Sequence, residues 1–197
     1  MGSEVYESLD KNWKNTARIL FGEELGELKD YEKWFCEYPG IPSSANSSVS
    51  GKEVTLGSEE YCADAHFRSL SEVDFAEEFK PLDVNEIKDI DSIVEAVRER
   101  VYYTGDIVLG NSKFTEASTN VTESNYVYKS RIVDESEYVA NSQTVKASKS
   151  VFGAWGSSYS GYLIRGLRAS SCQRCFEYMI ILNCSDVYYS AGLEGCT

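Results

Sequence analysis

Basic residues, histidine and long apolar runs are all scarce in this chain. Its 197 residues include 19 Lys and Arg against 32 Asp and Glu, a formal net charge of −13. Binding of nucleic acid needs positive charge to displace counterions from phosphates, so no nucleic-acid partner is expected. Most acidic residues precede Asp106 and are expected on solvated helix faces, with a DNA-mimicking or basic-partner surface as the alternative.

The lack of long apolar runs bears on location. No run approaches the about 20 residues that span a bilayer, so no membrane insertion is expected. The first residues, MGSEVYESLDKNWKN, lack the basic and apolar regions of a signal peptide. The sequence therefore predicts a cytoplasmic protein, or one within an assembled particle such as a virion. Without a secretory signal, the even number of cysteines, six, does not establish disulfides.

Common catalytic motifs are also missing. The sequence contains no GxGxxG, GxxxxGK[ST], GxSxG or HExxH, and it has one histidine. A Cys/His nucleophile pair stays open as a minor alternative, because tertiary neighbours are not visible in a sequence. The chain is predicted to be non-catalytic and to need no cofactor.

Residues 1–105 are predicted to form an α-helical and irregular capping region. Apolar side chains at helical spacing predict helices over residues 10–21, 23–38 and 89–103. Asp10 is expected to cap the first of these helices, and Gly22 to end it. The segment 39–51, PGIPSSANSSVSG, is expected to be an exposed loop. Residues 106–112 are expected to start the second half with a strand.

Residues 106–197 contain a six-residue repeat. One column holds serine and a second, three places further along, holds valine. The serine column is Ser118, Ser124, Ser130, Ser136, Ser142 and Ser148, and the valine column is Val121, Val127, Val133, Val139, Val145 and Val151. Residues six apart on an α-helix are rotated by about 240° net, so a helix would scatter each column over three faces. In a flat strand, residues three apart point to opposite faces. Both columns point inward only if the backbone bends at fixed intervals, which indicates a β-solenoid.

The residue that follows each valine shows that the true period of the repeat is twelve residues, not six. In alternate hexads it is always apolar, and in the intervening hexads it is mostly polar. Twelve residues per coil follow, with one aromatic face and one polar face. The fold class is therefore α+β: an N-terminal α-helical cap followed by a parallel two-faced β-solenoid, of about seven coils on the twelve-residue period. The apolar set is Tyr128, Ala140, Phe152, Ile164, Phe176 and Tyr188.

The inside of such a tube is narrow, so inward positions need small or medium side chains. Buried serine hydroxyls must find partners, most simply the backbone carbonyls at the bends. Ser157 in the valine column and Tyr178 in the serine column depart from the pattern, and a bulge or rearrangement is expected near residues 154–162 and around Tyr178.

An inward residue at every third place and twelve residues per coil resemble the compact solenoids of insect antifreeze proteins. That resemblance covers the repeat half only and is architectural. Those proteins carry a flat Thr-x-Thr face, which this chain lacks, so ice binding is not implied. The solenoids of hexapeptide acyltransferases and γ-class carbonic anhydrases match less well, since they place a small residue four positions after the aliphatic one, whereas here it follows by three.

Four cysteines in the repeat are weak metal-ligand candidates. Cys172 and Cys175 form a CxxC motif, and Cys184 and Cys196 follow Cys172 at twelve-residue steps. Vertical neighbours in a solenoid are about 4.8 Å apart, which suits zinc, an iron–sulfur cluster or a disulfide. The favoured interpretation is that these residues fill serine-sized slots as small hydrophobes. A second weak candidate combines Cys62 and His66, with Cys36 as a further ligand.

The aromatic row predicts an interaction surface formed by Tyr128, Phe152, Ile164, Phe176 and Tyr188. Either the N-terminal helices or a second chain is expected to cover it, because exposed apolar rows attract partners. The sequence also stops at Thr197 in mid-coil, and an uncapped coil invites edge-to-edge addition. The expectation is either a fragment of a longer protein or an open end that another subunit buries. The function predicted is a scaffold that self-associates or binds a protein partner. The alternatives are a carbohydrate-active or sugar-binding solenoid and a cysteine-ligated metal protein.

Overall fold

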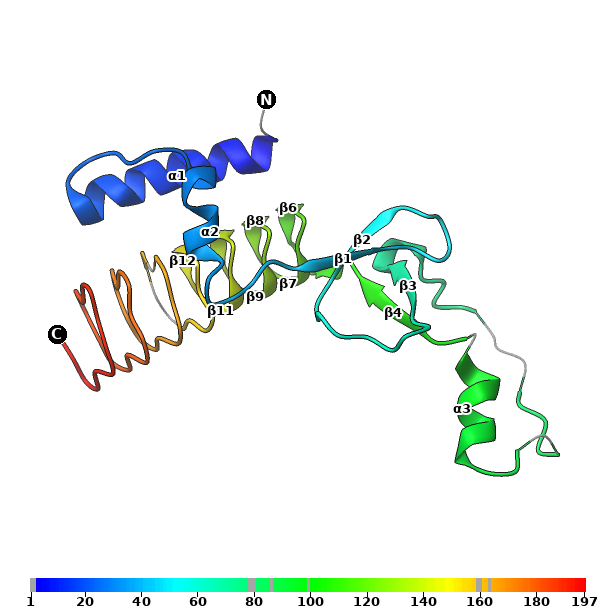
Figure 1. The fold of residues 1–197 in the computed structure, drawn as a ribbon. Helices are drawn as coiled ribbons and strands as arrows, with labels where there is room; N and C mark the ends of the chain where they lie inside the picture. The colour runs from blue at the N-terminus through cyan, green and yellow to red at the C-terminus, as the bar shows by residue number, and fades with distance from the viewer. Residues whose placement is uncertain (1–2, 78–80, 86, 99, 159–160, 163) are drawn as a thin grey trace.

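The computed structural model describes residues 3–77, 81–85, 87–98, 100–158, 161–162 and 164–197. It is a mixed α+β structure in which a helix at the N-terminus lies along a stack of parallel coils (Figure 1). A small group of strands and a further helix lie at one end of the stack, and the C-terminus lies at the other. The predicted fold class is confirmed: a helical N-terminus followed by a β-solenoid with twelve residues per coil.

Eight short strands build the solenoid. They form two parallel sheets, ordered β12-β10-β8-β6 and β11-β9-β7-β5. Partners are twelve residues apart, as in the pairing of Val127 with Val139, except between β5 and β7, where Val108 pairs with Val121, thirteen residues on. The strands are β5 (Val108–Leu109), β6 (Lys113–Glu116), β7 (Thr119–Thr122), β8 (Asn125–Tyr128), β9 (Arg131–Asp134), β10 (Glu137–Ala140), β11 (Gln143–Lys146) and β12 (Lys149–Phe152).

The solenoid of regular strands has about four coils, fewer than the seven expected. Beyond Phe152, isolated parallel bridges continue the stacking in the described part of the chain, at Lys149–Gly161, Gly161–Gln173 and Gln173–Asp186. The physical reason lies in the serine column, which changes to Ala154, Gly166 and Tyr178 after Ser142. These residues cannot supply the short hydroxyl bonds that hold successive coils in register.

The backbone bends that bring both columns inward are left-handed residues at every third position. Tyr126 has φ 55° between Ser124 and Val127, and Lys129 has φ 44° before the next serine. A non-glycine residue in this conformation costs about 1–2 kcal/mol, so stabilising contacts elsewhere in each coil must offset it. The same step recurs along the coils at Ala117, Asn120, Glu123, Ile132, Glu135, Tyr138, Asn141, Thr144, Ala147 and Ser150.

Serine hydroxyls join each coil to the next. Ser130 Oγ donates to the carbonyl of Tyr128 at 2.8 Å and accepts the backbone N–H of Ser142, twelve residues on, at 3.1 Å. The predicted partners at the bends are thus confirmed. The same pair of bonds is made by Ser118, Ser124, Ser136 and Ser142.

The valine column fills the tube. Val121, Val127 and Val139 are fully buried, and they share one core with the cysteines of the later coils. Tyr178 also stays inside, with no exposed surface, because its neighbours twelve residues away are the small Gly166 and Ser190. The rearrangement expected near residues 154–162 lies partly outside the described residues.

The first helix is longer than predicted. α1 spans Glu4–Phe21 and begins at Ser3, whose hydroxyl accepts the N–H of Tyr6 at 3.2 Å. Asp10 is therefore not the cap; its carboxylate accepts the N–H of Leu28 at 2.7 Å. Gly22, with φ 81°, ends the helix as predicted.

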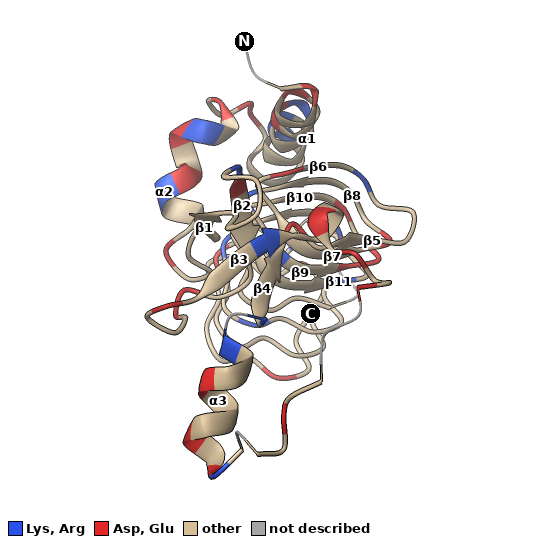
Figure 2. Cartoon of the chain, turned by 90° about the vertical axis from the view of Figure 1, so that its right-hand side faces the viewer, with Lys and Arg blue, Asp and Glu red and all other residues tan. Residues whose placement is uncertain are grey.

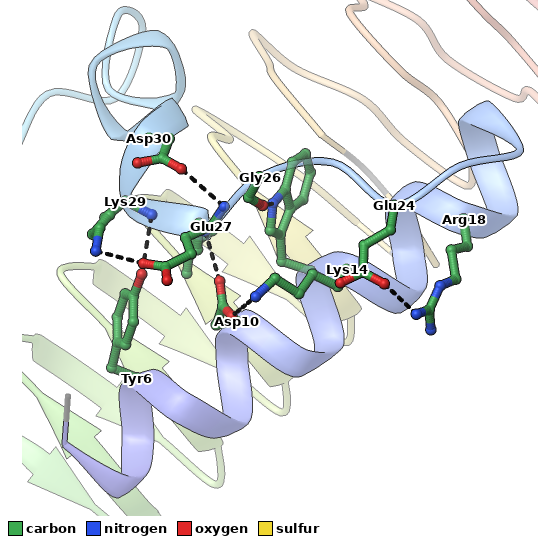
Figure 3. A network of polar contacts seen from close by, with 11 residues as sticks. Tyr6, Asp10, Lys14, Arg18, Glu24, Gly26, Glu27, Lys29 and Asp30 are labelled. Carbon is green, nitrogen blue, oxygen red and sulfur yellow. Dashed lines mark hydrogen bonds and ion pairs between the residues drawn. The ribbon is translucent and has the colours of Figure 1, made fainter. Parts of the chain in front are cut away.

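The helix expected over residues 23–38 is replaced by a loop, a 3-10 turn η1 (Leu28–Tyr31) and a single turn α2 (Glu32–Phe35). Contacts with α1 hold the loop in this form (Figure 3). Trp13 Nε1 donates to the carbonyl of Gly26 at 2.9 Å, and Tyr6 Oη accepts the N–H of Lys29 at 3.2 Å. Ion pairs of Lys14 with Asp10 and of Arg18 with Glu24 lie along the same helix.

Four strands in the first half were not predicted. β1 (Ser43–Asn46) lies in the segment 39–51 that was expected to be a loop. It pairs antiparallel with β2 (Glu53–Leu56). β3 (His66–Ser69) pairs parallel with β4 (Tyr102–Gly105) and leads into the turn η2 (Leu70–Glu72).

The third helix also ends earlier than predicted. α3 covers Ile90–Arg98, and Tyr102 and Tyr103 belong to β4. Aromatic pairing across the two strands explains the difference, since Phe67 lies opposite Tyr103 with ring centroids 6.0 Å apart. No described helix is long and apolar enough to cross a membrane.

Strands β1–β4 lie at the end of the solenoid where its first coil begins (Figure 1). Figure 2, which looks along the stack from that end, shows β2–β4 in front of the solenoid strands. The backbone N–H of Asp106 donates to the carbonyl of Thr55, and the Asp106 carboxylate accepts the Thr55 N–H. These bonds fasten β2 to the start of the first coil.

Candidate functional site on the aromatic face and the C-terminal coils

Helix α1 and turn α2 cover the middle of the aromatic face. The ring centroid of Trp13 lies 5.5 Å from that of Phe152 and 5.3 Å from that of Phe35. Phe152 and Ile164 have no exposed surface. These two members of the predicted interaction surface therefore belong to the core between the helices and the solenoid, and they offer nothing to a partner.

Tyr128 and Phe176 lie at the two borders of the covered region. Tyr128 packs edge-on against Tyr6, with centroids 5.8 Å apart, and both rings keep some exposure. Phe176 packs against Phe21 of α1, with centroids 4.7 Å apart. The helices thus end over the coil that carries Phe176.

Beyond Phe176 the aromatic face is open. Tyr189 packs against Phe176, with centroids 5.1 Å apart, yet it is 81% exposed, and Tyr188 is 50% exposed. An apolar hollow of about 460 Å³ lies beside them, lined by Phe21, Leu25, Trp34 and Phe176 among others.

Further exposed apolar side chains lie on the same coils. We call the following set, which includes residues from both faces of these coils, the C-terminal patch: Met179, Ile180, Leu182, Tyr188, Tyr189 and Leu193. Residues 179–197 carry only two charged side chains, Asp186 and Glu194, although the whole chain has a net charge of −13. Sequence reasoning identified Tyr188 but missed the rest. Leu182 follows the mostly polar column and Leu193 the inward valine column, and neither column predicts an exposed apolar side chain.

A buried arginine fastens the segment after α2 to the solenoid next to this patch. Arg165 forms ion pairs with Glu37 and Glu177, and its guanidinium lies 5.3 Å from the ring centroid of Trp34 and 5.0 Å from that of Tyr38. Two carboxylates and two ring faces offset the cost of burying its charge. The segment after α2 is therefore firmly held on the solenoid.

A second aromatic column lies on the earlier coils. The rings of Phe114, Tyr126 and Tyr138 are stacked nearly parallel, with centroids 4.7 and 4.9 Å apart. Sugar-binding sites use the open face of an aromatic ring, and in this column the rings cover one another's faces. The column is thus better suited to holding coils together than to binding a sugar.

The cysteine candidates of the repeat come together inside the solenoid. The Sγ atoms of Cys172, Cys175 and Cys184 lie within 4.8 Å of one another, and all three residues are buried. Cys196, in the same column, is half-buried and packs against the same core. The cysteines are free thiols.

The second candidate set is not brought together in the described part of the chain, where Cys172, Cys175 and Cys184 are the one group of possible metal ligands. Cys62 is exposed and contacts the hydroxyl of Tyr103 at 3.1 Å, and His66 packs against the ring of Tyr102. Cys36 lies half-buried beside α2, and burial raises the pKa of its thiol to about 11. These residues are explained by local packing.

Comparison of the chain with protein-family models, with curated protein sequences and with solved structures finds no match.

Proposed function

We propose that this protein is a non-catalytic scaffold that associates with a second copy of itself through the C-terminal patch. The observation that carries the proposal is the set of exposed apolar side chains on charge-poor coils, headed by Tyr188 and Tyr189. Exposed apolar patches on soluble proteins mark interaction sites, and tyrosine is enriched at the centres of interfaces.

One end of the solenoid is covered by its own chain, which favours one geometry of association. Strands β1–β4 lie over the first coil (Figure 1). A head-to-tail filament would need both ends. Pairing of two C-terminal ends uses the same surface on both copies and closes after two, as twofold dimers do.

Electrostatics favour the same surface. A chain of net charge −13 repels its copies wherever the acidic first half would be brought close. Contact through residues 179–197, which carry two charges, avoids most of that repulsion. Added salt screens what remains, so association is expected to strengthen with ionic strength.

Sedimentation velocity over a range of protein concentrations tests this proposal. We expect a monomer–dimer equilibrium that shifts to dimer as concentration rises. The variant Tyr189→Glu should weaken dimerisation by about 10-fold or more, on the order of the loss of one interface hot spot. Phe75→Glu is the matched control, because Phe75 is 84% exposed and lies in the first half.

A strict monomer at high concentration would overturn the proposal. So would a dimer that Tyr189→Glu leaves unchanged, because its interface would then lie elsewhere.

A further inference from the structure

Three cysteines replace the usual small residues at one level of the solenoid. Cys172 and Cys184 occupy the column that holds Ser124, Ser136 and Ser148 in earlier coils. Cys175 occupies the neighbouring valine column. Two adjacent coils thus contribute three thiols to one point of the dry interior, where each residue is 5% exposed or less.

The distances among these sulfurs suit one metal ion. Cys184 Sγ lies 3.7 Å from Cys172 Sγ, and the three Sγ atoms lie within 4.8 Å of one another. Zinc holds thiolates at about 2.3 Å in a tetrahedron, which places the sulfurs about 3.8 Å apart. A disulfide would join only two of the three thiols and leave the third unused.

A buried hydroxyl without a partner lies beside the cluster. Tyr178 is fully buried, and among the described residues its Oη has no hydrogen-bond partner. A buried hydroxyl without a partner is costly, so the protein's own groups leave this level of the interior incompletely satisfied.

We propose that Cys172, Cys175 and Cys184 bind one thiophilic metal ion, Zn²⁺ being the best match, inside the solenoid. Soft thiolate ligands select zinc and Cu(I) among common ions. Cys196 follows Cys184 by twelve residues and packs against the same core, so it is positioned to supply a fourth sulfur. The ion joins coils that lie beyond the last regular strand pairing. In these coils, cysteine takes the place of the serine that joins successive coils earlier in the solenoid.

Titration of the reduced full chain with Co²⁺ and Cd²⁺ tests the proposal. We expect a thiolate-to-metal absorption band that saturates at one ion per chain, and displacement of Co²⁺ by Zn²⁺. The variants Cys172→Ser and Cys184→Ser should abolish the band. Both should fold, because serine occupies the same column in earlier coils, and circular dichroism checks this.

The matched controls are Cys36→Ser and Cys62→Ser, since both cysteines lie outside the cluster and should leave the band intact. Zn²⁺ should raise the melting temperature of the wild type but not that of Cys172→Ser. The proposal fails if no band forms, if the band survives Cys172→Ser, or if mass spectrometry of the protein purified without reductant finds Cys172 disulfide-bonded. These readouts do not depend on dimerisation, so they are independent of the proposed function.

Discussion

Each buried serine of the serine column, which we call the serine ladder, makes two hydrogen bonds with its one hydroxyl group. Its Oγ donates to the carbonyl two residues before it and accepts the N–H of the residue twelve positions later, as Ser130 does with Tyr128 and Ser142. Threonine would add a methyl group in a narrow space, and alanine would make neither bond. At this scale, serine is required because it is the smallest side chain that both donates and accepts.

Substitution of Ser130 by alanine should lower the free energy of unfolding by about 2 kcal/mol, because it leaves the buried N–H of Ser142 without a partner. Urea denaturation followed by circular dichroism measures the change. Ser171→Ala is the control: Ser171 is exposed and outside the ladder column, so its effect should stay within about 0.5 kcal/mol. Equal effects of the two variants would contradict the role given to the ladder.

At the scale of elements, α1 packs against the solenoid through one apolar side and holds the following loop through polar side chains. Val5, Leu9 and Trp13 face the coils and are buried. Asp10 and Tyr6 bind the backbone of the following loop, which returns the chain over the aromatic face (Figure 3). The helix therefore covers the rings and also positions α2.

Replacement of Trp13 by alanine should destabilise the docking of α1 by about 4 kcal/mol, the usual cost of removing a buried tryptophan. The substitution removes the ring packing against Phe152, Phe35 and Tyr31 and the hydrogen bond to the carbonyl of Gly26. Chemical denaturation gives the value, with Lys11→Ala on the exposed side of the same helix as the control. A change below about 1 kcal/mol would show that α1 is not anchored through this side chain.

At the scale of the whole molecule, the solenoid is a one-dimensional stack in which each coil contacts only its neighbours. Coils up to Phe152 have paired strands on both faces, while the later coils have isolated bridges. The stability of such a stack varies along its length, and the weaker end opens first.

Hydrogen exchange of the reduced protein in the presence of a chelator should therefore distinguish the two parts. Backbone amides of residues 119–146 are expected to exchange at least about 10-fold more slowly than those of residues 164–190, in line with their regular strand pairing. Mass spectrometry of peptides measures this directly. Uniform protection along the solenoid would contradict the prediction.

Repetition explains why so much of the solenoid was predictable. A twelve-residue period places Val127 over Val139 whatever the rest of the chain does, because each coil repeats the local geometry of the one before. The need for regular bends, the inward columns and the serine partners follow from that period. The left-handed conformation that makes each bend does not, since Ile132 and Thr144 are poor residues for positive φ and only the coil geometry requires it.

The sequence by itself determined the repeat, its period, its narrow interior and the end of α1 at Gly22, because these depend on residues close in the chain or equivalent in successive coils. The tertiary structure decided which rings are buried, how β1–β4 lie over the first coil and which cysteines meet. Those outcomes depend on contacts between distant segments, such as the ion pair of Glu32 with Lys129 at 2.6 Å. Many different sequences satisfy such contacts, so no local sequence pattern predicts them.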